Sequence, residues 1–208
     1  DPDKLTVLHN FVDTSKYQVT AGHDDYLLYF GRIEKLKGLA TLVRAVAKTG
    51  HRLVIAGDGG WRNEMAAMIA DAPNITYAGF QSGGQLSRLI QNARAVVAPS
   101  EWYENCPMSV IEAKSYGRPV VAANIGGIPE LVRHDIDGFL FEPGDTGDLA
   151  RQLDAVHNID HAEFSLAARA DAEARFSGDN YLRSLMRVYA SVAEFAAGQP
   201  EPQLAQVR

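Results

Sequence analysis

The chain has 208 residues, of which 46% are hydrophobic and 22% are charged, a composition typical of a soluble globular protein. Its net charge of −6 argues against nucleic acid or an anionic membrane as the partner of the whole surface, although a local basic pocket is compatible with it. Cys106 is the only cysteine, so no intrachain disulfide can form, and because no apolar run approaches ~18 residues we expect no membrane-spanning helix. The start, DPDKLTV, lacks a signal-peptide pattern and an initiating methionine, so we expect a fragment or a processed form.

Short apolar runs alternate with helix-like stripes along the chain. In order, we expect a strand at 26–30, a helix at 37–49, a strand at 52–56, a helix near 61–69, a strand at 75–78, a helix near 86–90, a strand at 95–98, a helix at 107–116 with Pro107 at its first position, a strand at 119–122, a short helix at 128–132, a strand at 138–141, a helix at 146–156 capped by Thr146, and helices over 160–197. This alternation predicts an α/β fold, a Rossmann-like parallel sheet of about six strands with helices on both faces, followed by C-terminal helices. Ligands bind such sheets beyond the carboxyl ends of the strands, so the turns there are the candidate sites.

The turn after the first strand, residues 31–38, carries basic side chains. It has neither the glycine spacing of a dinucleotide fingerprint nor the Ser or Thr that follows the lysine of a P-loop. Arg32 can hold phosphate oxygens in a fork, and Lys37 supplies a point charge. Taken alone, this turn fits a phosphate site and a solvated basic loop about equally well.

The next two turns carry weaker signals. The glycines of the second turn, 57–60, let the backbone approach a ligand, but a plain strand-to-helix turn is the simpler interpretation. In the third turn Phe80 offers a ring on which a nucleobase can stack, although a core or rim phenylalanine is more common.

The fourth turn holds two carboxylates eight positions apart, Glu104 in the loop and Glu112 on the following helix. They are compatible with an acid/base pair as in sugar hydrolysis, with acceptors for sugar and ribose hydroxyls, or with two unrelated surface acids. Cys106 fits a packing residue better than a nucleophile. The six histidines show no metal-ligand spacing, so we expect no metal site.

The order of these motifs resembles one family. The motifs are Gly-Arg…Lys-Gly at 31–38, Ala-Gly-Asp-Gly at 56–59, Ala-Pro-Ser at 98–100, Glu104 with Glu112, Gly-x-Pro-Val-Val at 117–121, Gly-Gly-Ile-Pro-Glu at 126–130, Gly-Phe-Leu at 138–140 and Pro-Gly-Asp at 143–145. Over residues 26–156 the chain is similar to the C-terminal half of a retaining glycosyltransferase of the GT-B fold, of the family 4 or group 1 type. The paired glutamates and the 31–38 turn are specific to that family.

The resemblance implies a donor site. Arg32 and Lys37 match the pair that neutralises the donor pyrophosphate, Glu104 the glutamate near the donor sugar, and Glu112 the glutamate that accepts from the ribose. The other implied donor-binding residues are Gly31, Gly57, Asp58, Phe80, Gln81, Asn105, Cys106, Met108 and Ser109. The family is usually glycine-rich after the first glutamate, whereas this chain has Asn-Cys-Pro, and the proline has no N–H to donate.

The resemblance also implies an organisation and an activity. Residues 1–20 correspond to an interdomain linker, 21–156 to the nucleotide-sugar-binding domain, 157–197 to helices that pack back on a missing N-terminal acceptor domain, and 198–208 to a tail. The implied activity is retaining, metal-independent transfer of a hexose from a UDP- or GDP-sugar to an acceptor hydroxyl, with no cofactor besides that substrate. We expect this chain to bind donor without turnover, in the cytoplasm, with peripheral association at the inner membrane face left open.

Two alternatives stay open at this point. One is another GT-B enzyme, either a nucleotide-sugar epimerase or a glycan phosphorylase, although the cofactor-binding lysine motif of a phosphorylase is not found. The other is a non-catalytic carbohydrate- or protein-interaction module of the same fold. The sequence alone does not give the base, the sugar, the acceptor or the oligomeric state.

Overall fold

The computed structural model describes residues 5–20 and 22–197, with side chains to residue 193. Six parallel strands form one sheet in the order β3-β2-β1-β4-β5-β6. The strands are β1 (Leu27–Phe30), β2 (Leu53–Ala56), β3 (Ile75–Gly79), β4 (Ala95–Ala98), β5 (Val120–Ala123) and β6 (Gly138–Phe141). The expected Rossmann-like sheet of about six parallel strands is therefore confirmed.

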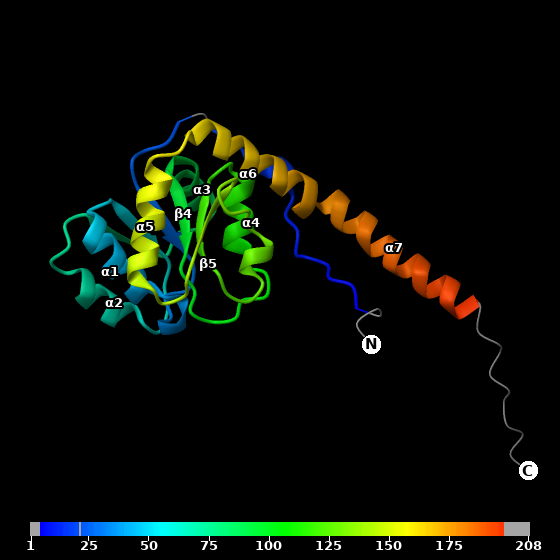
Figure 1. Cartoon of the computed structure of the whole chain (residues 1–208), viewed down its shortest axis with the longest axis horizontal. Coiled ribbons are helices and arrows are strands. Elements are labelled where there is room, and N and C mark those ends of the chain that lie inside the picture. Colours follow the sequence, from blue (N-terminus) through cyan, green and yellow to red (C-terminus); the bar gives the residue numbers. More distant parts are fainter. Residues whose placement is uncertain (1–4, 21, 198–208) are drawn as a thin grey trace, which may run out of the picture.

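Helices cover both faces of the sheet, as expected (Figure 1). They are α1 (Leu39–Thr49), α2 (Arg62–Ile69), α3 (Gly83–Asn92), α4 (Met108–Ser115), α5 (Thr146–His157), α6 (His161–Phe176) and α7 (Gly178–Ala197). One core cluster joins α1, α2 and α5 to the sheet, and a second cluster joins α3, α4 and the end of α6 to the other face. The strand order runs outward from β1 in one direction and from β4 in the other, so right-handed crossovers place the two sets of helices on opposite faces.

Local sequence explains why the elements on the site side begin and end where they do. All four residues of β1 are buried, as in a strand covered on both faces. The buried residues Leu39, Leu42 and Val46 give α1 its apolar face, and Gly50 ends the helix in the left-handed conformation, with φ of 75°.

Three details of the expected helices differ in the structure. The cap of α5 is Asp145 and not Thr146, because the Asp145 carboxylate accepts from the backbone N–H groups of Gly147 and Asp148 at 2.8 and 2.9 Å. Pro107 precedes α4 instead of opening it, because its ψ of 117° is extended. The short helix expected at 128–132 is a 3-10 turn, η4 (Ile128–Glu130).

The connections of β1 position the site. Chain order reverses between β1 and β4, which lie side by side, so the segments that leave their carboxyl ends diverge and open a crevice. The turn that begins at Gly31 forms one wall of this crevice, and the loop that begins at Pro99 forms the other.

The segment before β1 and the last helices lie together on the α4 side (Figure 1). The backbone N–H of Val12 donates to the carbonyl of Phe176 at 2.9 Å, and the ring of Phe11 stacks on Tyr181 at 4.6 Å. Helix α7 then projects away from the body, and its apolar residues Leu182, Met186, Tyr189 and Val192 are exposed. The expected tail at 198–208 lies outside the described residues. None of the described helices combines the length and apolar character that crossing a membrane requires.

Two histidine pairs lie at the edge of the sheet opposite the crevice. His51 stacks on His157 with ring centroids 3.5 Å apart, and His23 lies 4.1 Å from His161. A ring nitrogen of His161, Nε2, is 2.8 Å from the carbonyl oxygen of Arg94. Burial, with the positive groups nearby, lowers the pKa of His161 to about 4, and burial also lowers the pKa of His157.

We therefore expect this edge to lose stability in mild acid. His161 binds a proton below about pH 6.5 in the unfolded chain, but only below about pH 4 in the folded chain. The contribution of neutral His161 to the free energy of unfolding is therefore complete above about pH 6.5 and falls as pH drops toward 4. Urea unfolding of the wild type and His161→Gln between about pH 7 and pH 5 measures this contribution, on the order of 2 kcal/mol. An equal loss of unfolding free energy in both proteins would show that His161 does not carry it.

Candidate functional site

The crevice between β1 and β4 holds an ion pair between Lys37 and Glu104. The Lys37 side chain is 25% exposed and the Glu104 side chain 19%, and the hydroxyl of Ser100 donates to the same Glu104 oxygen at 3.1 Å. The cavity around this pair is lined by Tyr29, Phe30, Gly31, Arg32, Lys37, Val97, Ala98, Pro99, Ser100, Glu104, Pro107, Ser109 and Ile128. The structure thus brings Glu104 together with Arg32 and Lys37 of the basic turn, although Glu104 follows Lys37 by 67 positions in the sequence.

A groove of about 730 Å³ adjoins this cavity and shares its three charged residues. Its other lining residues are Asn10, Glu34, Lys35, Leu36, Trp102, Tyr103, Asn105 and Cys106. The two hollows form one cleft with a mixture of basic, acidic, amide and aromatic side chains. Such a lining can hold an anion at one end and hydroxyl groups at the other.

Close backbone contact fixes the basic turn. The hydroxyl of Tyr29 donates to the carbonyl of Arg32 at 2.6 Å, and burial raises the pKa of Tyr29. Gly38 has φ of 71°, and a Cβ there would lie 1.7 Å from the carbonyl oxygen of Pro99. Only glycine allows these two turns to touch, and this contact sets Lys37 opposite Glu104.

Glycines of the second turn support the basic turn from behind. A Cβ on Gly57 would lie 1.9 Å from the carbonyl oxygen of Gly31. The carboxylate of Asp58 makes only contacts to nearby residues: it accepts from the N–H of Gly59 at 2.9 Å and pairs with Arg62 at 3.5 Å. Gly57 and Asp58 do not line the cleft, and their donor-binding role stays a prediction.

The loop that carries Glu104 rests on a second glycine pair. The N–H of Gly127 donates to the carbonyl of Glu104 at 2.7 Å, and a Cβ on Gly127 would lie 2.0 Å from the carbonyl oxygen of Asn105. Sequence reasoning missed this support and the hydroxyl of Ser100. The Gly-Gly-Ile-Pro-Glu motif indicates a close backbone contact, but the sequence alone does not show which loop the two glycines contact.

Helix α4 separates the two glutamates. Glu112 and Met108 line another cavity, together with Val12, Asp13, Lys16, Tyr17, Leu86, Ser87, Ile90 and Tyr116, whereas Ser109 faces the cleft. Burial raises the pKa of Glu112. The structure therefore places Glu112 beside the cleft, across the first turn of α4, and not inside it.

The residues of the third turn also lie outside the cleft. Phe80 is 72% exposed, and the amide of Gln81 donates to the carbonyl of Ala78 at 2.6 Å. Gln81 lines a groove along α3 with Arg88 and Asn92. The donor-binding roles of Phe80 and Gln81 stay predictions.

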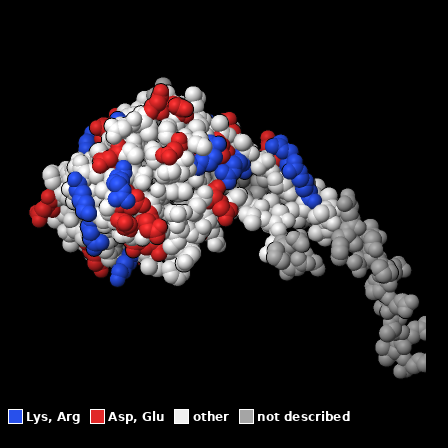
Figure 2. Space-filling view, in the orientation of Figure 1, with Lys and Arg blue, Asp and Glu red and all other residues white. Residues whose placement is uncertain are grey.

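Charged side chains of both signs are spread over the surface of the body. On the face shown in Figure 2, basic and acidic side chains are interspersed over the body and do not form one basic patch. Cys106 is half-buried, and burial raises the pKa of its thiol, which fits packing better than nucleophilic chemistry. Within residues 5–20 and 22–197, no three metal-ligating side chains gather in one place.

Replacing Gly38 tests the contact that builds the site. We expect Gly38→Ala to lower the free energy of unfolding by about 3 kcal/mol or more, because the new methyl group overlaps Pro99 and the residue has a positive φ. Gly84→Ala is the matched control, since it lies in α3 with nothing within 4 Å of an added Cβ. Chemical denaturation measures both variants, and an equally stable Gly38→Ala protein would refute the proposed contact.

Comparison with known proteins identifies the family. The family described as glycosyl transferases group 1 matches residues 13–175. The D-inositol 3-phosphate glycosyltransferase of Mycolicibacterium smegmatis is 32% identical over 97% of this chain and 51% of its own length. That of Mycobacterium marinum is 30% identical over 96% of this chain and 48% of its own length.

Solved structures share the fold. A glycosyltransferase from Rickettsia africae matches with a TM-score of 0.82 and 22% identity, over 93% of this chain and 59% of that one. The Anabaena protein HepE, in complex with UDP, matches with a TM-score of 0.77 and 23% identity, over 93% of this chain and 57% of that one. The chain spans about half the length of the curated relatives it matches. It belongs to the group 1 glycosyl transferase family and has the fold of one half of a GT-B protein.

Proposed function

We propose that this chain is the donor-binding half of a retaining glycosyltransferase, which moves a hexose from a UDP- or GDP-sugar to an acceptor hydroxyl. The observation that carries the proposal is the convergence of Arg32, Lys37 and Glu104 in the crevice between β1 and β4. Parallel α/β sheets bind nucleotides at such a reversal of strand order. Family membership supports the reaction class.

The diphosphate of the donor would lie between Arg32 and Lys37. An ammonium group has three N–H donors, so Lys37 can keep its bond to Glu104 and still donate to phosphate oxygens. The guanidinium of Arg32 is exposed in the same cleft and can hold two oxygens at once. The N-terminus of α4 adds a favourable partial charge beside Ser109.

The two cavities beside α4 suit the two ends of a nucleotide-sugar. From the diphosphate, the ribose would pass over the first turn of α4 to Glu112, whose carboxylate accepts hydroxyl hydrogens. The base would lie further toward Phe80 and Gln81. The hexose would occupy the opposite groove, where Glu104, Asn105 and Cys106 line the wall.

Charge development explains why the basic pair matters for transfer. When the bond between the anomeric carbon and the donor phosphate breaks, negative charge appears on the leaving diphosphate, and Arg32 and Lys37 stabilise that charge as it forms. The sugar gains oxocarbenium character, the acceptor oxygen bonds to the anomeric carbon, and the acceptor proton passes to the leaving diphosphate oxygen. Glu104 favours the positively charged sugar electrostatically. The proposal requires no metal and no cofactor besides the donor.

An N-terminal acceptor domain completes the proposal. The chain covers about half the length of its curated relatives, and the segment of residues 5–12 and α7 leave the body together. We assign residues 1–20 to the interdomain linker, 21–156 to the donor domain, 157–197 to helices that return to the missing domain, and 198–208 to a tail. We place the whole protein in the cytoplasm, and we assign any peripheral membrane association to the missing domain.

Removing the charge of Lys37 tests donor binding. We expect Lys37→Met to weaken binding of UDP or GDP by about 2 kcal/mol, roughly thirtyfold, because a charge-assisted contact to phosphate is lost. Lys48→Met changes the same charge at an exposed position on α1 and should bind like the wild type. Calorimetric titration with UDP, GDP and ADP measures both, and unchanged affinity in Lys37→Met would favour a non-catalytic module.

The second test concerns turnover. Since the acceptor and part of the catalytic machinery are assigned to the missing domain, this chain should bind donor without releasing UDP from UDP-glucose or GDP from GDP-mannose. The full-length protein should release the nucleotide when its acceptor is present. Sugar transfer by this chain alone would contradict the assignment.

A further inference from the structure

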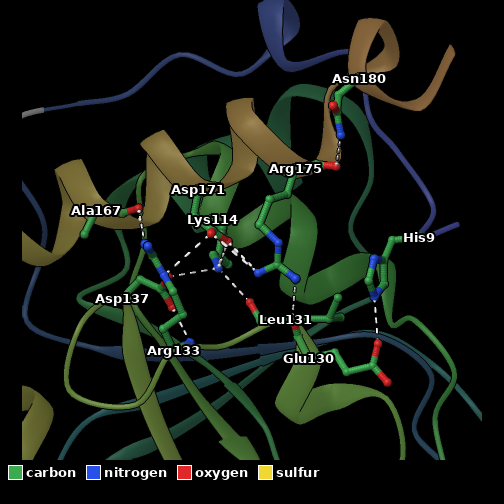
Figure 3. Close-up of polar contacts among 10 residues, drawn as sticks. All are labelled: His9, Lys114, Glu130, Leu131, Arg133, Asp137, Ala167, Asp171, Arg175 and Asn180. Atoms are coloured by element: carbon green, nitrogen blue, oxygen red, sulfur yellow. Dashed lines mark hydrogen bonds and ion pairs between the residues drawn. The ribbon is translucent and has the colours of Figure 1, made fainter. Parts of the chain in front are cut away.

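A buried cluster of charges joins α4 to the C-terminal helices (Figure 3). Lys114 of α4 is fully buried and donates to Asp137 at 3.1 Å, to Asp171 at 2.5 Å and to the carbonyl of Leu131 at 2.6 Å. Both carboxylates are buried too. An ion cluster buried to this degree holds its parts in one arrangement, because moving any member would leave a charge without a partner.

Two arginines flank this cluster and differ in what else they touch. Arg133 donates to Asp137 at 2.6 Å and to the carbonyl of Ala167 at 3.1 Å. Arg175 pairs with Asp171 at 3.3 Å, and its other terminal nitrogen donates to the carbonyl of Glu130 at 2.5 Å. The guanidinium of Arg175 also lies 4.8 Å from the ring centre of Phe176, which fixes its direction.

The backbone of Glu130 leads from Arg175 to the cleft. The N–H of Glu130 donates to the carbonyl of Gly127 at 3.2 Å, and the N–H of Gly127 donates to the carbonyl of Glu104 at 2.7 Å. Three hydrogen bonds therefore connect the guanidinium of Arg175 to the residue that pairs with Lys37. The glycine leaves no space for the turn to slide, because a Cβ on Gly127 would overlap the loop.

Glu130 and Arg175 each hold one of the two segments that leave the domain. The Glu130 carboxylate bonds to His9 at 2.9 Å, and His9 lies in the segment before β1. The carbonyl of Arg175 accepts from the side chain of Asn180 in α7 at 3.1 Å, so Arg175 holds the start of the last helix (Figure 3).

We propose that Arg175 is a positioning residue for the donor site. By holding the carbonyl of Glu130, it fixes η4 and the Gly126–Gly127 turn beneath the Glu104 loop, and so sets the Glu104 carboxylate against Lys37. Through His9 and Asn180 the same junction fixes how the segments toward the rest of the protein leave this domain. The inference rests on the proposed function for its effect on nucleotide binding, but not for its effect on the loop.

A matched pair of variants separates positioning from plain stability. Arg175→Met and Arg133→Met each remove one guanidinium from the same charge cluster, but only the first removes the bond to Glu130. We expect both to lower the melting temperature. Only Arg175→Met should speed amide hydrogen exchange at Gly127 and weaken binding of UDP or GDP about tenfold. Arg175→Lys, which can still donate to one carbonyl, should restore part of the slow exchange at Gly127 and part of the nucleotide affinity.

Each outcome decides the proposal. Wild-type exchange at Gly127 in Arg175→Met would overturn it, and so would equal changes in exchange and affinity in the two methionine variants, which would indicate a structural role only. If the wild type binds neither UDP nor GDP, the proposed function fails. The exchange at Gly127 then still decides whether Arg175 positions the loop.

Discussion

The ion pair between Lys37 and Glu104 is the interaction on which the site depends, because it joins the two turns that leave the neighbouring strands β1 and β4. Each turn is held by a contact that only glycine permits, Gly38 against Pro99 on one side and Gly127 against Asn105 on the other. These backbone contacts determine where the two charged side chains lie. They explain how two side chains that are 67 positions apart share one cavity.

The fold was predictable from sequence because parallel strands buried on both faces are short apolar runs, and the helices between them carry apolar stripes. The basic turn and the Glu104 loop were predictable for a related reason, since the turns at the carboxyl ends of parallel strands gather at one edge. The side of α4 on which Glu112 lies was not predictable. The rotation of a helix about its axis decides it, and here the segment around Asp13 and Tyr17 packs against α3 and α4 to form a separate cavity.

The support behind the site was also beyond sequence reasoning. Lys114, Asp137 and Asp171 look like ordinary surface charges in a sequence, because charged residues are rarely buried unless paired. Their burial depends on α6 crossing α4, a long-range contact that no local pattern records. Arg175 joins this cluster to the carbonyl of Glu130, so the segment before β1 and the start of α7 are connected to the cleft by hydrogen-bonded backbone.

The central claim is that a nucleoside diphosphate lies across the start of α4, with its phosphates in the crevice and its ribose at Glu112. A crystal structure of the chain soaked with UDP tests it most directly. The account predicts phosphate oxygens within hydrogen-bond distance of Arg32 and Lys37, and a ribose hydroxyl on the Glu112 carboxylate. UDP bound with its phosphates away from both basic side chains, for example along the groove beside α3, would contradict it.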